Sequence, residues 1–376
     1  MPPAINVADF SRLAKRRLPR MVFDYLEGGA EDETGLLRNA EAFDHLRLMP
    51  FKLRDVSRRT LSCELFGRTM SAPLVVAPTG LNGAFWPNGD LALARAAAKA
   101  SIPFALSTAS NATIEEVADR AGGDLWFQLY VIHRELADAL VARANSAGYT
   151  TLVLTVDVGV SGKRERDLRN GFAMPMRYSP RVVLDGLLHP RWSLDMLAKG
   201  MPKLANLASA AALDTAAQAA LLKRQMDTSF DFEALKALRD RWPRTLVVKG
   251  LLAPSDVERC FALGVDGVVL SNHGGRQLDH APAPMAVLPD IIKRAHGALM
   301  IDSGIRRGSD VVKAIAGGAR AVMLGRALLY GLGAAGEAGV SDVIDIFKDE
   351  IDRTMALIGC SEMGKLDSTY IDKRLR

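Results

Sequence analysis

Eight short apolar segments, alternating with alanine-rich stretches of helical spacing, constrain the fold of this chain more than any other feature. Their near-continuous apolar character is typical of strands buried on both faces, and strands that alternate with helices indicate a parallel sheet. Eight such units predict an α/β fold, the (β/α)8 TIM barrel. The predicted strands are Leu74–Ala77, Phe104–Ser107, Trp126–Tyr130, Thr151–Val156, Leu246–Lys249, Gly267–Leu270, Leu299–Ile301 and Ala321–Leu324.

A long insertion interrupts this pattern after the fourth predicted strand. Most consecutive strands begin about 20 to 30 residues apart, the length of one βα unit, whereas the fourth and fifth begin at Thr151 and Leu246. Residues 177–226 lie in this gap and have no place in a minimal barrel. We therefore predict a separate element here that is added to the barrel.

The first 70 residues precede the barrel and are predicted to form an N-terminal extension that packs on it. A capped helix is expected over Asn6–Arg16. The tract 25–30, Tyr-Leu-Glu-Gly-Gly-Ala, is expected to end a second helix with glycines that permit a positive φ. With these two additions, residues 1–376 are interpreted as a single domain.

Positive charge is concentrated in the insertion. The chain has 48 Lys and Arg against 43 Asp and Glu, a net charge of +5, and residues 177–226 carry +4 of it. So small a surplus elsewhere gives no reason to expect nucleic-acid binding. Leu204–Leu222 is too often interrupted by polar residues for a transmembrane span. It is interpreted as an interfacial helix, with Trp192 and the basic residues at an anionic lipid surface; the alternative is a soluble lid or an oligomer contact.

The cysteines and the N-terminus suggest a cellular location. Cys63, Cys260 and Cys360 are odd in number and far apart, which favours a reducing compartment over a disulfide framework. The first 20 residues lack an apolar core with a small-residue cleavage site. The cytoplasm is therefore the expected location.

Polar residues follow the predicted strands in register, at the end of a barrel where enzymes of this fold place their active sites. No metal site is predicted among them. In chain order they are Thr79, Gly80, Ser107, Gln128, Tyr130, Thr155, Asp157, Lys249, Ser271, His273, Arg276, Asp302, Gly304, Arg306, Gly325 and Arg326.

Two of these groups have a chemistry that can be assigned from position. After the last two strands, Gly304 and Gly325 each accompany an arginine ahead of a helical stretch, which predicts a phosphate site; the alternative is a pair of tight turns. His273 lies beside two glycines with Arg276 three residues on, so a base and a carboxylate-binding guanidinium can face one pocket. Asp157 could hold the imidazolium form of this histidine.

Other polar residues remain ambiguous by position. Lys249 is a costly charge inside a barrel unless it meets an anion, and an ion pair with a barrel carboxylate is its alternative. Arg164 belongs to a charged loop that could simply be solvated. Tyr25 and Tyr130 could be packing residues.

The segment 271–277, Ser-Asn-His-Gly-Gly-Arg-Gln, closely resembles the active-site motif of the FMN-dependent α-hydroxy-acid dehydrogenase and oxidase family. The resemblance extends through DYLEGGAED (24–32), LWFQLYV (125–131), LTVDV (154–158), VKG (248–250), DSGIRRG (302–308) and LGRALLYG (324–331). Three further motifs resemble a membrane-associated branch of the family that acts on mandelate: PTGLNGAFWPNGD (78–90), LSTASN (106–111) and HPRWSLD (189–195). Gly80 fits this branch, because the oxidases tend to carry alanine there.

The resemblance implies that FMN lies across the mouth of the barrel. Residues implied for the isoalloxazine and ribityl parts are Thr79, Gly80, Ser107, Gln128, Thr155, Lys249 and Ser271. Residues implied for the ribityl and phosphate end are Asp302, Gly304, Arg306, Gly325 and Arg326. His273 is implied as the catalytic base with Asp157 as its partner, Arg164 and Arg276 as ligands of the substrate carboxylate, and Tyr25 and Tyr130 as donors to substrate oxygens.

The activity implied is oxidation of an (S)-2-hydroxy acid, with mandelate favoured, to the 2-oxo acid. Electrons would pass to a quinone-type acceptor in the membrane, which the enzyme would contact through residues 177–226 on the inner face of the cell membrane. The resemblance also implies a homotetramer. An L-lactate dehydrogenase or a 2-hydroxy-acid oxidase that uses oxygen is the alternative.

Overall fold

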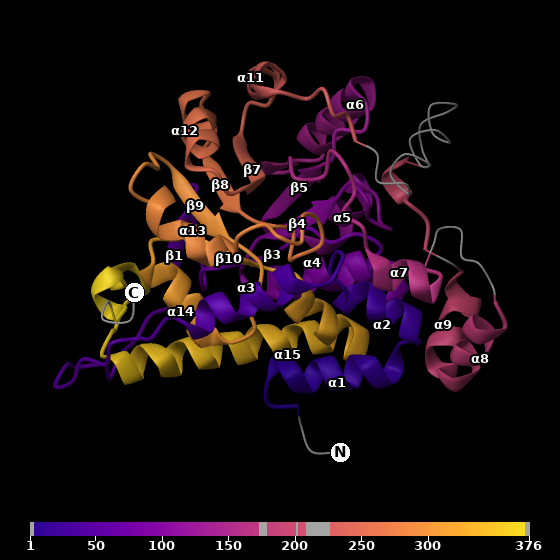
Figure 1. The fold of residues 1–376 in the computed structure, drawn as a ribbon, viewed down its shortest axis with the longest axis horizontal. Helices are drawn as coiled ribbons and strands as arrows, with labels where there is room; N and C mark the ends of the chain where they lie inside the picture. The colour runs from indigo at the N-terminus through magenta and orange to yellow at the C-terminus, as the bar shows by residue number, and fades with distance from the viewer. Residues whose placement is uncertain (1–3, 173–178, 201, 208–225, 373–376) are drawn as a thin grey trace.

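Eight parallel strands close into a barrel in the computed structural model, which describes residues 4–172, 179–200, 202–207 and 226–372 (Figure 1). The strand order is β10-β3-β4-β5-β6-β7-β8-β9, which confirms the predicted TIM barrel. Every predicted strand is found, with bounds that differ by two residues at most. The strands are β3 (Leu74–Val76), β4 (Phe104–Ser107), β5 (Leu125–Leu129), β6 (Thr151–Thr155), β7 (Thr245–Leu251), β8 (Gly267–Leu270), β9 (Ala298–Ile301) and β10 (Ala321–Leu324).

Alternate residues of each strand point into the barrel or out towards the helices. Val153 and Val247 belong to the interior cluster, whereas Leu152 and Leu246 belong to the larger cluster between strands and helices. Because both sets are apolar and buried, the strands read as continuous apolar segments in the sequence. The helices of this outer layer are α4 (Gly89–Ala100), α5 (Ile114–Ala121), α6 (Arg134–Ser146), α11 (Phe232–Arg241), α12 (Pro254–Ala262), α13 (Pro284–Ile291), α14 (Gly308–Ala316) and α15 (Arg326–Ile358).

A hairpin closes the amino-terminal end of the barrel. It consists of β1 (Cys63–Leu65) and β2 (Arg68–Met70), and its turn residue Phe66 lies 5.9 Å from the Trp126 ring inside the barrel. A Cβ atom on Gly267 would lie 2.6 Å from the Phe66 ring, so glycine is needed for this close approach. With this end plugged, the carboxyl ends of the strands are left as the open mouth.

The N-terminal extension contributes α1 (Val7–Arg17), α2 (Arg20–Glu27) and α3 (Thr34–Asp44), and α1 packs along α15 (Figure 1). Asn6 caps α1 by accepting a hydrogen bond from the Asp9 amide at 2.9 Å. The prediction of positive φ at the glycines after α2 is wrong, because neither Gly28 nor Gly29 adopts it. They are small for a different reason: Cβ atoms there would lie within 3 Å of the Asp24 and Gly275 carbonyl oxygens.

Helix α7 (Glu165–Asn170) precedes the insertion, which itself contributes α8 (Pro180–Leu188), α9 (Pro190–Lys199) and a short 3-10 turn, η2 (Ala205–Leu207). Helices α8 and α9 lie at one end of the molecule, beyond α2 and α7 (Figure 1). The helix expected over Leu204–Leu222 falls mostly on residues 208–225, which lie outside the described residues. Within the described ranges, no helix has the length and apolarity needed to cross a bilayer.

Trp192 corrects one prediction about the insertion. We expected its ring at a lipid surface, but the side chain is buried and its Nε1 donates to the Ala84 carbonyl at 2.8 Å. An indole N–H with a carbonyl partner inside the protein is satisfied there and has no need of an interface. Trp192 thus attaches α9 to the loop after β3, and the Arg17–Asp195 ion pair attaches it to α1.

Candidate active site

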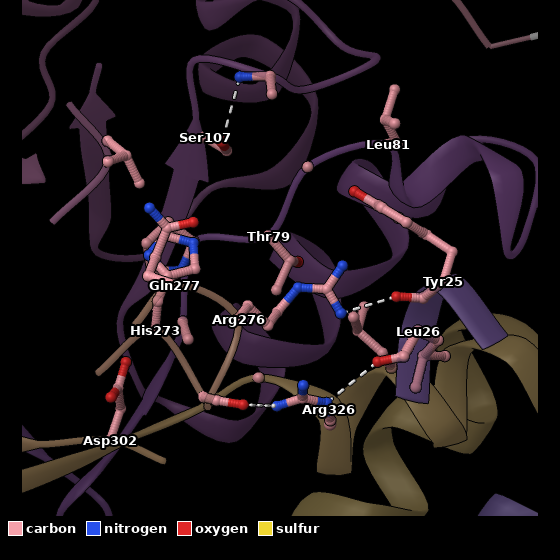
Figure 2. A pocket seen from close by; sticks show the side chains of 18 of the residues that line it. Tyr25, Leu26, Thr79, Leu81, Ser107, His273, Arg276, Gln277, Asp302 and Arg326 are labelled. Carbon is pink, nitrogen blue, oxygen red and sulfur yellow. Dashed lines mark hydrogen bonds between the residues drawn. The ribbon is translucent and has the colours of Figure 1, made fainter. Parts of the chain in front are cut away.

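A cavity of about 420 Å³ opens at the carboxyl ends of the barrel strands, a size within the range of cofactor and substrate sites (Figure 2). Most predicted site residues line it: Tyr25, Thr79, Gly80, Ser107, Tyr130, Arg164, Lys249, His273, Arg276, Asp302, Gly304, Arg306, Gly325 and Arg326. The other four, Gln128, Thr155, Asp157 and Ser271, each adjoin a lining residue through a hydrogen bond or a strand pairing. The residues selected from the sequence therefore gather around one cavity.

His273 and Asp157 form a hydrogen-bonded pair at this mouth. His273 follows β8 with a φ of 59°, in the left-handed region, and its amide donates to Ser271 Oγ at 3.0 Å. Its Nδ1 lies 3.0 Å from Asp157 Oδ1. Because an ionised carboxylate can only accept, Nδ1 carries the proton and Nε2 keeps a free lone pair. The imidazole is thus oriented as a base whose reactive atom is Nε2.

The pKa values of this pair suit that role. Burial opposes ionisation of Asp157, but the charges of His273 and Lys249 outweigh it and lower the pKa of the carboxyl. Burial lowers the pKa of His273 below its usual value; the Asp157 carboxylate opposes this shift, while Lys249 and Arg164 add to it. At neutral pH the carboxylate is therefore ionised and the imidazole is neutral, ready to accept a proton.

Lys249 pairs with Asp302 at 3.0 Å, and both side chains are about nine-tenths buried. Its Nζ also donates to Ser271 Oγ at 2.9 Å. Burial disfavours the ammonium, but the Asp302 and Asp157 carboxylates outweigh it and raise the pKa of Lys249. The ion pair considered as an alternative is therefore present. Lys249 nevertheless still faces the cavity, since both residues of the ion pair line its wall.

Arg276 and Arg164 bring two guanidinium groups to the cavity. Arg276 Nη1 donates to the carbonyls of Tyr25 and Gly28, each at 2.8 Å, and Arg164 Nε donates to the Arg276 carbonyl at 3.3 Å. Two cations on one cavity wall can orient a carboxylate, because guanidinium donors match its two oxygens.

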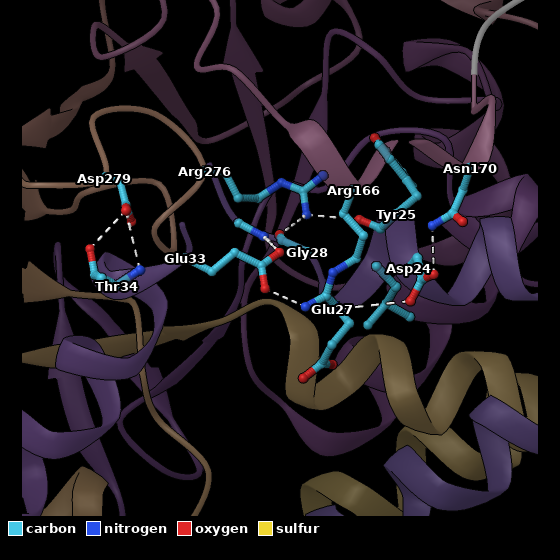
Figure 3. Close-up of polar contacts among 12 residues, drawn as sticks. Asp24, Tyr25, Glu27, Gly28, Glu33, Thr34, Arg166, Asn170, Arg276 and Asp279 are labelled. Carbon is cyan, nitrogen blue, oxygen red and sulfur yellow. Dashed lines mark hydrogen bonds and ion pairs between the residues drawn. The ribbon is translucent and has the colours of Figure 1, made fainter. Parts of the chain in front are cut away.

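Arg166, from the same charged loop as Arg164, points elsewhere. Its guanidinium pairs with Glu33 and lies 3.7 Å from Asp24, both in the N-terminal extension (Figure 3). Arg166 therefore ties α7 to the extension and leaves Arg164 at the cavity. Sequence charge alone gave no basis for choosing between these two arginines, because the carboxylates that hold Arg166 are distant in the chain.

Tyr25 and Tyr130 both line the cavity. Burial raises the pKa of Tyr130 to about 12, so it is a hydrogen-bond donor at neutral pH. Tyr25 stacks on Phe172 with ring centroids 4.2 Å apart. Several apolar lining residues had no sequence signal, because loops distant in the chain supply them: Leu81, Phe85, Val158, Phe172, Leu204 and Met226.

Positive charge also gathers in the part of the wall at the start of α15, next to Arg276. Arg326 donates to the Gly274 and Gly28 carbonyls, each at 2.9 Å, and to the Leu26 carbonyl at 3.1 Å, a bond that is drawn in Figure 2. Burial, together with the charges of Arg276 and Arg306, lowers the pKa of Arg326. A phosphate would relieve this repulsion and could also bind the amino terminus of the helix.

The two glycines at this end differ. Gly304 has a φ of +87°, and a Cβ atom there would lie 2.1 Å from the Asn39 carbonyl oxygen, so its turn requires glycine. Gly325 has a negative φ, and the nearest atoms to a Cβ there would be 3.9 Å away. The tight-turn alternative therefore accounts for Gly304, whereas Gly325 leaves space beside the cavity.

Two buried polar atoms beside the cavity provide a test for a flavin. Gln128 Nε2 and Thr155 Oγ1 have no hydrogen-bond partner among the described residues. Buried polar groups are normally satisfied, so a missing partner points to a ligand. A flat heterocycle edged with nitrogen and oxygen atoms could supply it, beside the Lys249 cation and the phosphate end. The residues present therefore fit FMN.

A barrel mouth with a base, a carboxylate clamp and a phosphate-binding end defines an enzyme that works on a small acid with a phosphorylated cofactor. The chain belongs to the FMN-dependent dehydrogenase family, whose model matches residues 14–373. FMN is thus its cofactor, and the enzyme is a flavin-dependent oxidoreductase.

Individual relatives cover nearly the whole chain. It is 59% identical to (S)-mandelate dehydrogenase from Pseudomonas putida, over 97% of this chain and 93% of the relative. It is 38% identical to L-lactate dehydrogenase from Pseudomonas syringae pv. syringae, over 98% of both chains. A crystal structure of (S)-mandelate dehydrogenase, described as a monotopic membrane protein, superimposes with a TM-score of 0.96 at 58% identity, covering 99% of this chain and 100% of the other.

Proposed function

We propose that this protein oxidises an (S)-2-hydroxy acid with an aromatic side chain, mandelate being favoured, to the 2-oxo acid. The observation that carries the proposal is the His273–Asp157 pair, in the same cavity as the guanidinium groups of Arg276 and Arg164. The apolar lining residues, Phe85 and Phe172 among them, support an aromatic side chain. The relatives named for mandelate and lactate support the substrate class.

Each group on the wall has a role in this reaction. Arg276 and Arg164 bind the substrate carboxylate, and Tyr25 and Tyr130 donate to its oxygens, so that the α-carbon is held in one place. His273 Nε2 accepts either the α-proton or the hydroxyl proton, and Asp157 stabilises the resulting imidazolium. FMN supplies the two-electron acceptor when bound. Lys249 supplies a fixed cation for negative charge that develops beside it.

The remaining predicted residues would hold the cofactor. Thr79, Gly80, Ser107, Gln128, Thr155 and Ser271 would contact its ring and ribityl chain. Asp302, Gly304, Arg306, Gly325 and Arg326 would hold the ribityl and phosphate end. For Gln128 and Thr155 this assignment is supported by their unpartnered buried atoms; for Arg326 it is supported by the surrounding positive charge.

Anaerobic bleaching of the flavin by a panel of 2-hydroxy acids tests the reaction. We expect mandelate to bleach it faster than lactate or glycolate, and air to reoxidise it more slowly than a soluble quinone does. If lactate is fastest, the substrate assignment is wrong. Rapid reoxidation by oxygen would favour an oxidase. If no 2-hydroxy acid bleaches the flavin, the proposed activity is excluded.

The insertion is proposed to attach the enzyme to the inner face of the cell membrane, where a quinone-type acceptor is available; by family resemblance we also propose a homotetramer. Helices α8 and α9 expose six apolar side chains: Val183, Leu184, Leu187, Leu188, Leu194 and Leu197. Arg181, Arg191, Lys199 and Lys203 are exposed in the same segment. Apolar and basic groups in short helices favour an anionic lipid surface.

Vesicle sedimentation tests this attachment. Leu187 and Leu188 are each 71% exposed on α8, and Leu357 on α15 is 61% exposed, which makes it a matched control. We expect Leu187→Glu combined with Leu188→Glu to release the enzyme from anionic vesicles, and Leu357→Glu to leave it bound. Equal retention of both variants would contradict attachment through α8.

A further inference from the structure

The insertion returns to the barrel at residues 202–207 and binds the loop that follows β4. The Ala205 amide donates to the Ser110 carbonyl at 3.1 Å, and Asn111 Nδ2 donates to the Lys203 carbonyl at 2.7 Å. Ser110 and Asn111 are the last two residues of the motif LSTASN (106–111), and the proposed reaction gives these two residues no other role. We name residues 202–207 the return segment.

Asn206 fixes the return segment most firmly. It is fully buried, its Oδ1 accepts from the Ile114 amide at 2.9 Å, and its Nδ2 donates to Ser110 Oγ at 2.8 Å. Its carbonyl accepts from Arg143 Nη1 at 3.2 Å. A buried amide with both ends bonded holds one orientation, because any other would leave polar atoms unsatisfied.

The surface that receives the return segment is itself held rigidly. The buried Asp90 carboxylate accepts from the Asn111 amide at 2.7 Å and from Asn82 Nδ2 at 2.7 Å. Asn111 Oδ1 in turn accepts from the Gly83 amide at 2.7 Å. The loops after β3 and β4 therefore form one hydrogen-bonded unit, and the return segment joins it.

This attachment determines where Leu204 lies. Leu204 precedes Asn206 by two residues, is 7% exposed and lines the active-site cavity. Phe172 and Met226, on either side of α8 and α9 in the chain, line the same cavity, and Phe172 stacks on Tyr25. Leu204 and Met226 of the insertion, with Phe172 just before it, thus provide one apolar part of the cavity wall, while the exposed leucines of the insertion lie on α8 and α9.

We infer that Leu204 determines specificity by contacting the side chain of the 2-hydroxy acid, and that Asn206 is a positioning residue that acts through it. The inference rests on the proposed function, since it assumes a 2-hydroxy acid in the cavity. An apolar group in the wall has no favourable contact with a carboxylate or a hydroxyl, so the substrate group it can discriminate is the side chain. A phenyl group would reach further than the methyl group of lactate.

The Leu204→Ala variant tests the contact directly, because it removes no hydrogen bond of the return segment. We expect kcat/KM for mandelate to fall about tenfold relative to kcat/KM for lactate, as is typical when a few apolar carbons leave a pocket. The Kd of phenylacetate, measured from the flavin absorbance change, should rise similarly against that of acetate. Leu357→Ala, at a 61% exposed position of α15 that is given no role in binding, is the matched control.

The Asn206→Ala variant tests the positioning role. It should lower the mandelate-to-lactate ratio in the same direction, and the double variant with Leu204→Ala should be no worse than Leu204→Ala alone, because both act through one contact. Asn206→Asp keeps the acceptor for the Ile114 amide and should retain most of the ratio. If Asn206→Ala does not fold, Leu204→Ala and Asn206→Asp still decide the question.

Three outcomes would overturn the inference. One is an unchanged substrate ratio in Leu204→Ala with the flavin still bound. Another is loss of FMN without a change in the ratio, which would place Leu204 against the cofactor. The third is full additivity in the double variant, which would make Asn206 only structural. Failure of the proposed function is distinguishable, because unmodified enzyme would then not oxidise any 2-hydroxy acid.

Discussion

Two pairs of a basic side chain and a carboxylate lie at the barrel mouth, each with a nitrogen-to-oxygen distance of 3.0 Å, and they behave differently. In the His273–Asp157 pair, burial lowers the pKa of the imidazole, so the histidine is neutral at neutral pH. In the Lys249–Asp302 pair, the carboxylates raise the pKa of the ammonium, so the lysine stays charged. Equal geometry thus gives one pair that can accept a proton and one that provides fixed charge.

Removing the base should have the largest effect. In His273→Ala we expect anaerobic flavin reduction by mandelate to slow by about 10⁴-fold, the upper range for general base catalysis. The visible absorbance of bound FMN should persist, since the imidazole is not assigned to cofactor binding. Rapid reduction in this variant would remove the distinction between the two pairs, because neither pair would then accept a proton in the reaction.

Removing the fixed charge should have the next largest effect. We expect Lys249→Met to slow flavin reduction by about 10² to 10³-fold, as for loss of other preorganised charges. The variant also leaves the Asp302 carboxylate buried without its partner, at a cost of about 3 kcal/mol in the free energy of unfolding.

A second substitution separates these two consequences of losing Lys249. In Lys249→Met combined with Asp302→Asn, thermal unfolding should recover most of the lost stability, because no unpaired buried charge remains. Flavin reduction should stay slow. Recovery of the rate together with stability would mean that the lysine only neutralises Asp302.

Asp157→Asn should slow flavin reduction less than loss of either His273 or Lys249. The amide oxygen can still accept from His273 Nδ1, but the negative charge that stabilises the imidazolium is lost. We expect flavin reduction to slow by about 10²-fold, with FMN retained. Stopped-flow measurement at a series of pH values gives this rate. If Asp157→Asn slows flavin reduction as much as His273→Ala does, the histidine does not work as a base without the negative charge of Asp157.

The sequence predicted the barrel well, because buried strands form continuous apolar segments that can be recognised locally, such as Thr151–Thr155 and Gly267–Leu270. It also placed polar residues at the mouth, because in a barrel the position after a strand is a position at the site. The errors in the prediction from sequence concern which group a side chain contacts. Trp192 was assigned to lipid, since nothing near it in the chain indicates that the Ala84 carbonyl is its acceptor.

The roles of Lys249 and Leu204 could not be predicted from the sequence, because they depend on contacts between residues that are far apart in the chain. The Lys249–Asp302 pair joins two strand ends separated by 53 positions, and both a cofactor role and an ion pair were consistent with the sequence. Leu204 carries no chemical signal at all. It lines the cavity two residues before the buried Asn206, whose own partners, Ser110 and Ile114, are more than 90 residues away.

The pH dependence of kcat/KM gives the smallest and most specific test of the two pairs. Because His273 must be neutral and its pKa is lowered, activity should fall on the acid side only below the usual histidine value near 6.5. Deprotonation of Lys249 should cause no loss of kcat/KM just above neutral pH, because the pKa of this lysine is raised. The Asp157 carboxylate opposes the lowering of the histidine pKa, so Asp157→Asn should move the acid limb to still lower pH. Asp302→Asn should leave that limb in place, and a shift of equal size in both variants would mean that the pairs act as one charge network.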